Sequence, residues 1–163
     1  MAVKTLYIVR HGKALQDYRS IHDYDRTLIE KGIVNNISVA KLLHSQYGTP
    51  ELIISSHAAR ALHTAHIFAR EMGYPHDQVE VNENLYLDGE TEVCDILESL
   101  PDELESIMIV GHNPDMTYIA NLYAGQSIYS IPTSGVVAIR FEAERWKEIK
   151  QAKAKCTVHF PNL

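Results

Sequence analysis

Residues 5–14 read Thr-Leu-Tyr-Ile-Val-Arg-His-Gly-Lys-Ala, a short apolar run that ends in a cation, an imidazole and a glycine. The apolar part, residues 6–9, contains β-branched and aromatic side chains and predicts a buried strand. Arg10 and His11 follow directly, so they would lie at the carboxyl edge of a sheet, where open α/β folds form their ligand sites. An isolated Arg-His-Gly favours an ordinary loop, because three residues match by chance often. Its meaning therefore depends on partners elsewhere in the chain.

The chain has 163 residues and a formal net charge of −6, with 45% hydrophobic and 22% charged residues. This length and composition predict a single globular domain over residues 1–163. The negative charge argues against nucleic acid or an anionic membrane as partner, although a local cluster of cations can still bind an anion. Cys94 and Cys156 lack the spacing of a disulfide framework or zinc site and indicate a reducing compartment. With no signal peptide and no membrane-spanning apolar run, we expect a cytoplasmic protein.

Hydrophobic periodicity predicts alternating strands and helices along the rest of the chain. Further strands are predicted at residues 52–54, 79–81, 107–110, 136–141 and 156–160, with the last two as a hairpin. Helices are predicted from a Thr27–Glu30 capping box to Gly48, from the turn at residues 55–60 to Gly73, over residues 91–100, and from an Asn113 N-cap to Gly125. This order predicts a three-layer α/β/α sandwich, with a mostly parallel central sheet and helices on both faces.

Three strand–turn–helix junctions carry cations or imidazoles. The first holds Arg10 and His11, the second Ser56 and Arg60, and the third His112 at a predicted helix N-terminus. In a doubly wound sheet these junctions meet at one edge. Two arginines, two histidines and a helix N-terminus favour a dianionic phosphate, because guanidinium groups match phosphate oxygens bidentately.

This set of residues predicts covalent catalysis by an imidazole. The GxxxxGK[ST] phosphate loop is absent from the sequence, which argues against a nucleotide triphosphatase, and no carboxylate cluster has metal-ligand spacing, so we expect no metal. A neutral His11 would attack phosphorus and form a phosphohistidine that water later hydrolyses. The fixed cations would stabilise the transition state. Neighbouring arginines would keep His11 neutral, whereas His112, facing the phosphate, would be biased toward its cation.

Several segments resemble motifs of the histidine phosphatase superfamily, the phosphoglycerate-mutase-like group. Its motifs are matched, in the right order, by residues 7–14, 56–65 and 110–114. Residues 25–32 and 133–135 are similar to a compact subgroup, the bacterial phosphohistidine phosphatases. The resemblance runs from residue 5 to about residue 160 and implies a phosphoglycerate-mutase-like fold without a cofactor. It also implies His11 as the nucleophile, with Arg10, Arg60 and His112 forming the phosphate pocket. We further expect Gly12 and Asn113 to contact the phosphate.

The chain departs from the larger members of this superfamily at the acid that protonates the leaving oxygen. Residues 83–87, Glu-Asn-Leu-Tyr-Leu, place Leu87 where those members carry the acid, and the compact subgroup similarly lacks it. An alkoxide leaves poorly without a proton, whereas the imidazole of phosphohistidine needs less help. The sequence has no long insertion that would form a lid. We therefore predict a phosphatase that removes phosphate from phosphohistidine in a protein.

Two other functions stay open at this point: a small-molecule phosphomonoesterase, and a phosphate- or phosphoprotein-binding module without turnover. A pure binding module has no need of the nucleophile His11. Auxiliary roles as a substitute acid, a substrate contact or a further cation are open to five residues, although charged and polar side chains in such loops are more often simply solvated: Asp17, Glu83, Asp88, His22 and Lys13. The sequence indicates neither the physiological partner nor the oligomeric state.

Overall fold

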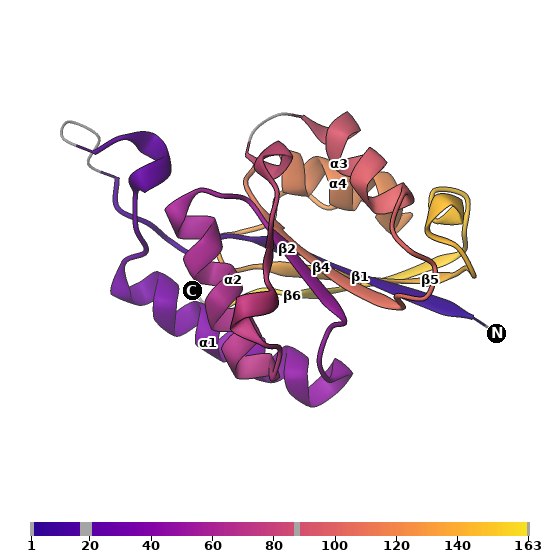
Figure 1. Cartoon of the computed structure of the whole chain (residues 1–163), viewed down its shortest axis with the longest axis horizontal. Coiled ribbons are helices and arrows are strands. Elements are labelled where there is room, and N and C mark those ends of the chain that lie inside the picture. The colour runs from indigo at the N-terminus through magenta and orange to yellow at the C-terminus, as the bar shows by residue number, and fades with distance from the viewer. Residues whose placement is uncertain (1, 17–20, 87–88, 163) are drawn as a thin grey trace.

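The computed structural model describes residues 2–16, 21–86 and 89–162. Within these ranges six strands form one sheet in the order β3-β2-β4-β1-β5-β6 (Figure 1). The strands are β1 (Val3–Arg10), β2 (Leu52–Ser55), β3 (Glu80–Val81), β4 (Ser106–Gly111), β5 (Val136–Glu142) and β6 (Ala154–His159). Neighbours from β3 to β1 pair in parallel, whereas β5 pairs antiparallel with both β1 and β6. The predicted mostly parallel sheet is confirmed, and its last two strands form the expected hairpin.

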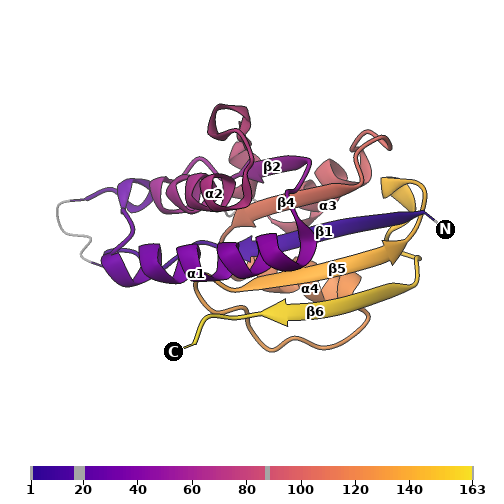
Figure 2. The same ribbon diagram turned by 90° about the horizontal axis from the view of Figure 1, so that it is seen from below.

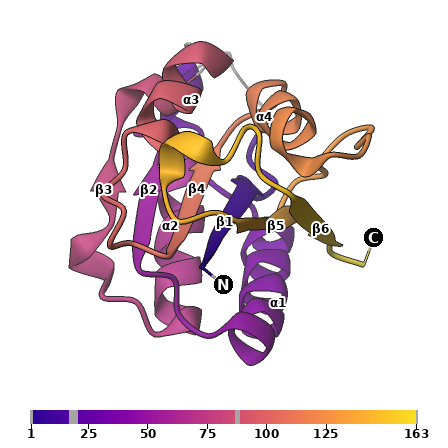
Figure 3. The ribbon, with the colours of Figure 1, turned by 90° about the vertical axis from the view of Figure 1, so that its right-hand side faces the viewer.

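Helices cover both faces of this sheet. In Figures 1 and 3, α1 (Glu30–Tyr47) and α2 (Ala59–Met72) lie on one side, and α3 (Glu90–Glu98) and α4 (Asp115–Ala124) lie on the other. Short 3-10 helices are η1 (Asp23–Asp25), η2 (His76–Gln78), η3 (Glu83–Leu85) and η4 (Trp146–Glu148). No helix within the described ranges is long and apolar enough to cross a membrane.

Strand β1 is buried on both faces, as a central strand of such a sheet must be. Alternate side chains of a strand point to opposite faces. Leu6 and Ile8 accordingly join the core under α3 and α4, while Tyr7 and Val9 join the core under α1 and α2. Figure 2 shows α1 and α2 lying over the near face of the sheet. The predicted three-layer α/β/α sandwich is confirmed.

The start of α1 differs from the sequence prediction. Its N-cap is Ile29 rather than Thr27, and no side chain caps it, so the predicted capping box is wrong. The backbone carbonyl of Thr27 instead accepts a hydrogen bond from the amide of Leu15 (2.9 Å), and Ala14 and Leu28 form an isolated β-bridge. This bridge keeps the backbone extended up to Ile29, and helix formation therefore begins only at Glu30.

The start of α4 is displaced by one residue from the prediction. Pro114, predicted as the first helical residue, is the N-cap, and the helix begins at Asp115. The side chain of Asn113 still reaches the first turn, where its Oδ1 accepts hydrogen bonds from the amide (3.2 Å) and hydroxyl (2.9 Å) of Thr117. Asn113 thus supports the helix from one position further out than predicted.

Candidate active site

The strand register brings the three predicted junctions together. Arg10, the last residue of β1, lies opposite Gly111 of β4, and Ser55 of β2 lies opposite Val110. The residues that follow these strands therefore leave the sheet at the same edge. His11, Arg60 and His112 all become buried there.

A hydrogen bond within its own turn fixes the tautomer and the ring orientation of His11. Its ring Nδ1 lies 2.7 Å from the carbonyl oxygen of Gly12, which can only accept, so Nδ1 carries the proton and Nε2 carries the lone pair. Arg60 Nε donates to this Nε2 at 3.4 Å. Burial is the main cause that lowers the pKa of His11 to about 4; the bond to Gly12 acts against this, and the charges of Arg60, Arg10 and Arg26 add to it.

His112 lies beside His11 with its ring centroid 5.1 Å away. Its Nε2 lies 2.8 Å from the hydroxyl of Ser56, while its Nδ1 is buried and finds no hydrogen-bond partner in the described part of the chain. Burial, followed by His11 and Arg60, lowers the pKa of His112 to about 2. The protein's own groups therefore disfavour the cation, and the bias predicted for His112 has to come from a phosphate dianion beside it.

Arg10 points toward the loop that precedes β5. Its Nη1 donates to the carbonyl of Ile131 (3.0 Å), and its Nε is buried without a partner among the residues described. Burial lowers the pKa of this guanidinium. The same loop is tied to the first turn, because the amide of Ser134 donates to the carbonyl of His11 (3.1 Å).

Thr64 of α2 holds the turn after β1 in place. Its hydroxyl accepts from the amide of Gly12 (3.0 Å) and from Nδ2 of Asn36 (3.0 Å), and it donates to the carbonyl of Arg60 (2.8 Å). A Cβ atom on Gly12 would lie 2.8 Å from Nδ2 of Asn36 and 3.1 Å from the carbonyl oxygen of Gly32, so a larger residue would displace the Asn36 side chain. The Gly12 amide is thus engaged by the protein itself, and the phosphate contact predicted for Gly12 draws no support from this N–H.

The remaining predicted residues lie at the margin of the site or outside the residues that the structure describes. The side chain of Asn113 is already engaged by the protein. Its Nδ2 donates to Ile131 (3.0 Å) and Ser130 (3.3 Å) of the loop, and its Oδ1 accepts from Thr117 of α4. Exposed positions are occupied by Lys13, His22 and Glu83. Asp17, Leu87 and Asp88 fall outside the described residues.

Two residues that the sequence analysis did not single out contact the site. Asp23 of η1 accepts from Arg60 Nη2 (3.3 Å), Arg26 Nη1 (2.9 Å) and the hydroxyl of Tyr86. The Tyr86 hydrogen bond is the largest of the causes that lower the pKa of Asp23 to about 2, and the two arginines add to it. The ring of Tyr86 packs edge-on against His112, with centroids 5.1 Å apart. No sequence signal separated Asp23 from its neighbours Asp17 and Asp25, whereas Tyr86 stands directly beside the position where an acid was sought.

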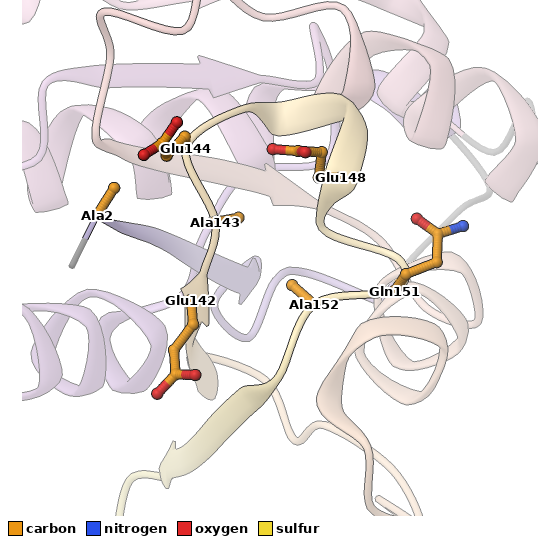
Figure 4. Close-up of a pocket in the computed structure, with 7 residues that line it drawn as sticks. All are labelled: Ala2, Glu142, Ala143, Glu144, Glu148, Gln151 and Ala152. Carbon is orange, nitrogen blue, oxygen red and sulfur yellow. The ribbon is translucent and has the colours of Figure 1, made fainter.

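A separate hollow at the opposite end of the sheet has the wrong charge for phosphate. Figure 4 shows its lining residues, which include Glu142, Glu144, Glu148 and Ala2. Ala2 precedes β1, so this hollow lies at the amino edge of that strand, away from Arg10. Carboxylates repel a phosphate dianion. Within the described ranges, no group of three or more His, Cys, Asp or Glu residues is arranged to hold a metal ion.

Comparison with known proteins agrees with this geometry. The model of the histidine phosphatase superfamily (branch 1) matches residues 6–86. An uncharacterised chloroplastic protein of Arabidopsis thaliana is 29% identical over 154 residues, with 89% of this chain and 70% of the relative covered.

Solved structures share the fold over nearly the whole chain. A putative phosphohistidine phosphatase SixA from Agrobacterium tumefaciens is 26% identical, with a TM-score of 0.74 over 83% of this chain and 90% of its own. A putative phosphohistidine phosphatase SixA from Nakamurella multipartitia is 20% identical, with a TM-score of 0.82 over 99% of this chain and 98% of its own. Small-molecule phosphatases, such as a mycobacterial glucosyl-3-phosphoglycerate phosphatase, share the fold as well. With its motifs gathered at one sheet edge, the chain resembles the histidine phosphatase superfamily, and its fold resembles that of the compact SixA-like phosphatases.

Proposed function

We propose that this phosphatase works through a covalent phosphohistidine formed on His11. The observation that carries the proposal is the hydrogen bond from Nδ1 of His11 to the carbonyl of Gly12 (2.7 Å), which leaves the lone pair on Nε2. A nucleophilic imidazole needs that nitrogen unprotonated at the working pH. A pKa of about 4 keeps the His11 imidazole neutral near pH 7.

The reaction proceeds in two displacements. Nε2 of His11 attacks phosphorus in line, a P–N bond forms, and the bond from phosphorus to the leaving atom breaks. Arg10, Arg60 and His112 stabilise the negative charge that spreads over the equatorial oxygens. Water then attacks the phosphohistidine, the P–N bond breaks, and inorganic phosphate leaves with His11 restored.

The substrate we propose is phosphohistidine in a protein. The carboxylate that contacts Arg60 belongs to Asp23, whose pKa of about 2 keeps it ionised, so it has no proton to give an alkoxide near neutral pH. Glu83, another candidate acid, is exposed. An imidazole leaving group needs less protonation than an alkoxide. The SixA structures that share this fold are themselves named as putative phosphohistidine phosphatases, which supports the same substrate class.

Replacement of His11 tests the nucleophile. We expect the purified protein to hydrolyse p-nitrophenyl phosphate in the presence of EDTA, and His11→Ala to reduce this to background. His63→Ala, an exposed histidine of α2, is the matched control and should keep full activity. Activity that survives in His11→Ala would overturn the assignment.

Two further measurements separate this proposal from its alternatives. A labelled substrate should leave an acid-labile, base-stable phosphoenzyme on the parent protein; phosphate binding without such a species would instead indicate a binding module. Turnover on a histidine-phosphorylated protein should exceed turnover on sugar phosphates. A large preference for sugar phosphates would favour the small-molecule phosphomonoesterase.

A further inference from the structure

Asp23 accepts two hydrogen bonds from the outer end of the Arg60 guanidinium. Nη1 of Arg60 donates to the backbone carbonyl of Asp23 at 2.9 Å, and Nη2 donates to its carboxylate Oδ2 at 3.3 Å. Arg60 is 5% exposed, so its guanidinium has few alternative positions. The short helix η1, which carries Asp23, contacts α2.

These two hydrogen bonds determine which edge of the guanidinium faces the nucleophile. A guanidinium offers five N–H groups, arranged as an end fork on Nη1 and Nη2 and a side fork on Nε and Nη2. Asp23 takes the end fork. The side fork is thereby turned toward His11, whose Nε2 lies 3.4 Å from Nε of Arg60.

Asp23 is itself fixed from two further sides. Its Oδ1 accepts from Nη1 of Arg26 at 2.9 Å, and its Oδ2 accepts from the hydroxyl of Tyr86. Tyr86 also places its ring 6.0 Å from Cζ of Arg60. Arg26 and Tyr86 thus hold Asp23 in the position from which it contacts the Arg60 guanidinium.

We propose that Asp23 is a positioning residue, which orients Arg60 so that the Nε–Nη2 edge faces a phosphoryl group in line with His11. The proposal rests on the proposed function, since it assumes phosphoryl transfer to His11. Asp23 does not touch the reacting atoms in this role. It acts through Arg60, whose side fork would contact two equatorial oxygens of the transferring group.

Orientation of this kind affects the transition state more than the bound substrate. Misplacement of a binding group by about 1 Å can lower a rate by roughly a hundredfold. A loss restricted to the transition state lowers kcat and leaves KM nearly unchanged. The proposal therefore predicts a split between the two constants, which a general loss of stability would not produce.

Asp23→Asn is the main test, because it preserves size and removes the charge. With p-nitrophenyl phosphate we expect kcat to fall by about tenfold to a hundredfold, with a much smaller change in KM. Inhibition by orthovanadate, which mimics the transferring phosphoryl group, should weaken by a similar factor, while inhibition by inorganic phosphate changes little. Tyr86→Phe should give a smaller loss of the same kind. Asp25→Asn, an exposed neighbour on η1, is the matched control and should behave like the parent.

A second background shows whether Asp23 acts through Arg60. In Arg60→Lys the forks are gone, so adding Asp23→Asn should lower kcat little further, and the two losses should not add. Additive losses would overturn the proposal, as would an unchanged kcat with only a lower midpoint of unfolding. A rise in kcat or in phosphate affinity on Asp23→Asn would instead mean that the carboxylate competes with phosphate for Arg60. The His11→Ala experiment fails or succeeds independently, so a wrong nucleophile and a wrong role for Asp23 are distinguishable.

Discussion

The hydroxyl of Ser56 decides where His112 carries its proton. Its oxygen already accepts from the amide of Ala58 (3.2 Å), and its own hydrogen is left for Nε2 of His112, 2.8 Å away. In the reverse arrangement the buried Ser56 O–H and the lone pair of His112 Nδ1 would both be without partners. Because unsatisfied buried groups are destabilising, the first arrangement prevails. His112 then presents an Nδ1–H that suits a phosphate oxygen.

Ser56→Ala should remove the hydrogen bond that fixes the tautomer of His112. We expect kcat/KM to fall by about tenfold, the equivalent of one hydrogen bond of about 1.4 kcal/mol. The ¹⁵N chemical shifts of the His112 imidazole should move toward a mixture of tautomers. Ser55→Ala is the matched control, because the Ser55 hydroxyl donates to the Ser56 carbonyl (2.9 Å) rather than to His112. Unchanged imidazole shifts in Ser56→Ala would contradict the assignment.

At this scale the sequence predicts residues that follow strands better than residues that reach the site from loops. Arg10, His11 and His112 stand directly after β1 and β4, so the rule for parallel sheets places them at one edge. Asp23 comes from η1 and Tyr86 from the end of η3, and neither position is set by a strand. Their contacts arise only from tertiary packing, which hydrophobic periodicity does not encode.

Among the elements, the turn after β1, helix α1 and helix α2 meet at the hydroxyl of Thr64. Gly12 reaches it from the turn, Asn36 from α1, and Thr64 itself returns a hydrogen bond to Arg60 within α2. Thr64 and Asn36 are fully buried. This one hydroxyl therefore couples the position of the His11 turn to that of the Arg60 helix.

Thr64→Val should uncouple them with almost no change in volume. The amide of Gly12 and the Nδ2 group of Asn36 would each lose a buried acceptor, at about 1–3 kcal/mol per group. We expect the free energy of unfolding in urea to fall by about 2–4 kcal/mol, together with a lower kcat. Thr117→Val on α4 removes a hydroxyl outside this junction and controls for the loss of any threonine hydrogen bond. Equal stability of parent and Thr64→Val would show that water or a shifted partner replaces the hydroxyl.

Element boundaries show where local signals are overridden. The Thr27–Glu30 capping box is a valid local pattern, but the bridge between Ala14 and Leu28 holds that segment extended. The same region depends on Gly32, where a Cβ atom would lie 2.3 Å from the carbonyl oxygen of Lys13. The first turn of α1 thus lies against the residues after His11, a close approach that only the folded backbone reveals.

For the whole molecule, the sequence predicts the layers but not the full order of strands. Alternating strands and helices were sufficient for a three-layer sandwich and for the convergence of the parallel strands at one edge. The β5–β6 hairpin was predicted too, yet its place beside β1 was not, because an apolar strand does not specify its neighbour. This gap left the site prediction intact, since Arg10, Arg60 and His112 follow the parallel strands.

Burial of two neutral histidines at one edge should make the whole fold sensitive to acid. The pKa of His11 is lowered to about 4 and that of His112 to about 2, from an unfolded value of 6.5. Below about pH 6.5 the unfolded chain therefore binds protons that the folded chain does not, and stability falls as the pH falls toward 4. Each such group contributes a slope of about 1.4 kcal/mol per pH unit in this window. Burial lowers the pKa of His159 and His66 as well, so they act in the same direction.

Urea unfolding from about pH 7 to about pH 4.5 measures this slope, and His112→Asn isolates one contribution to it. Asparagine does not titrate, so the variant should lose stability less steeply than the parent, by about 1.4 kcal/mol per pH unit, whatever its stability at pH 7. His63→Asn, exposed on α2, should leave the slope unchanged. Asp23 does not contribute to the slope in this pH range, because its lowered pKa means that protonation of its carboxylate reduces stability only below about pH 4. A parent and a His112→Asn variant with equal slopes would mean that His112 is protonated in the folded protein, and the neutral Nδ1–H donor assigned to it would then be wrong.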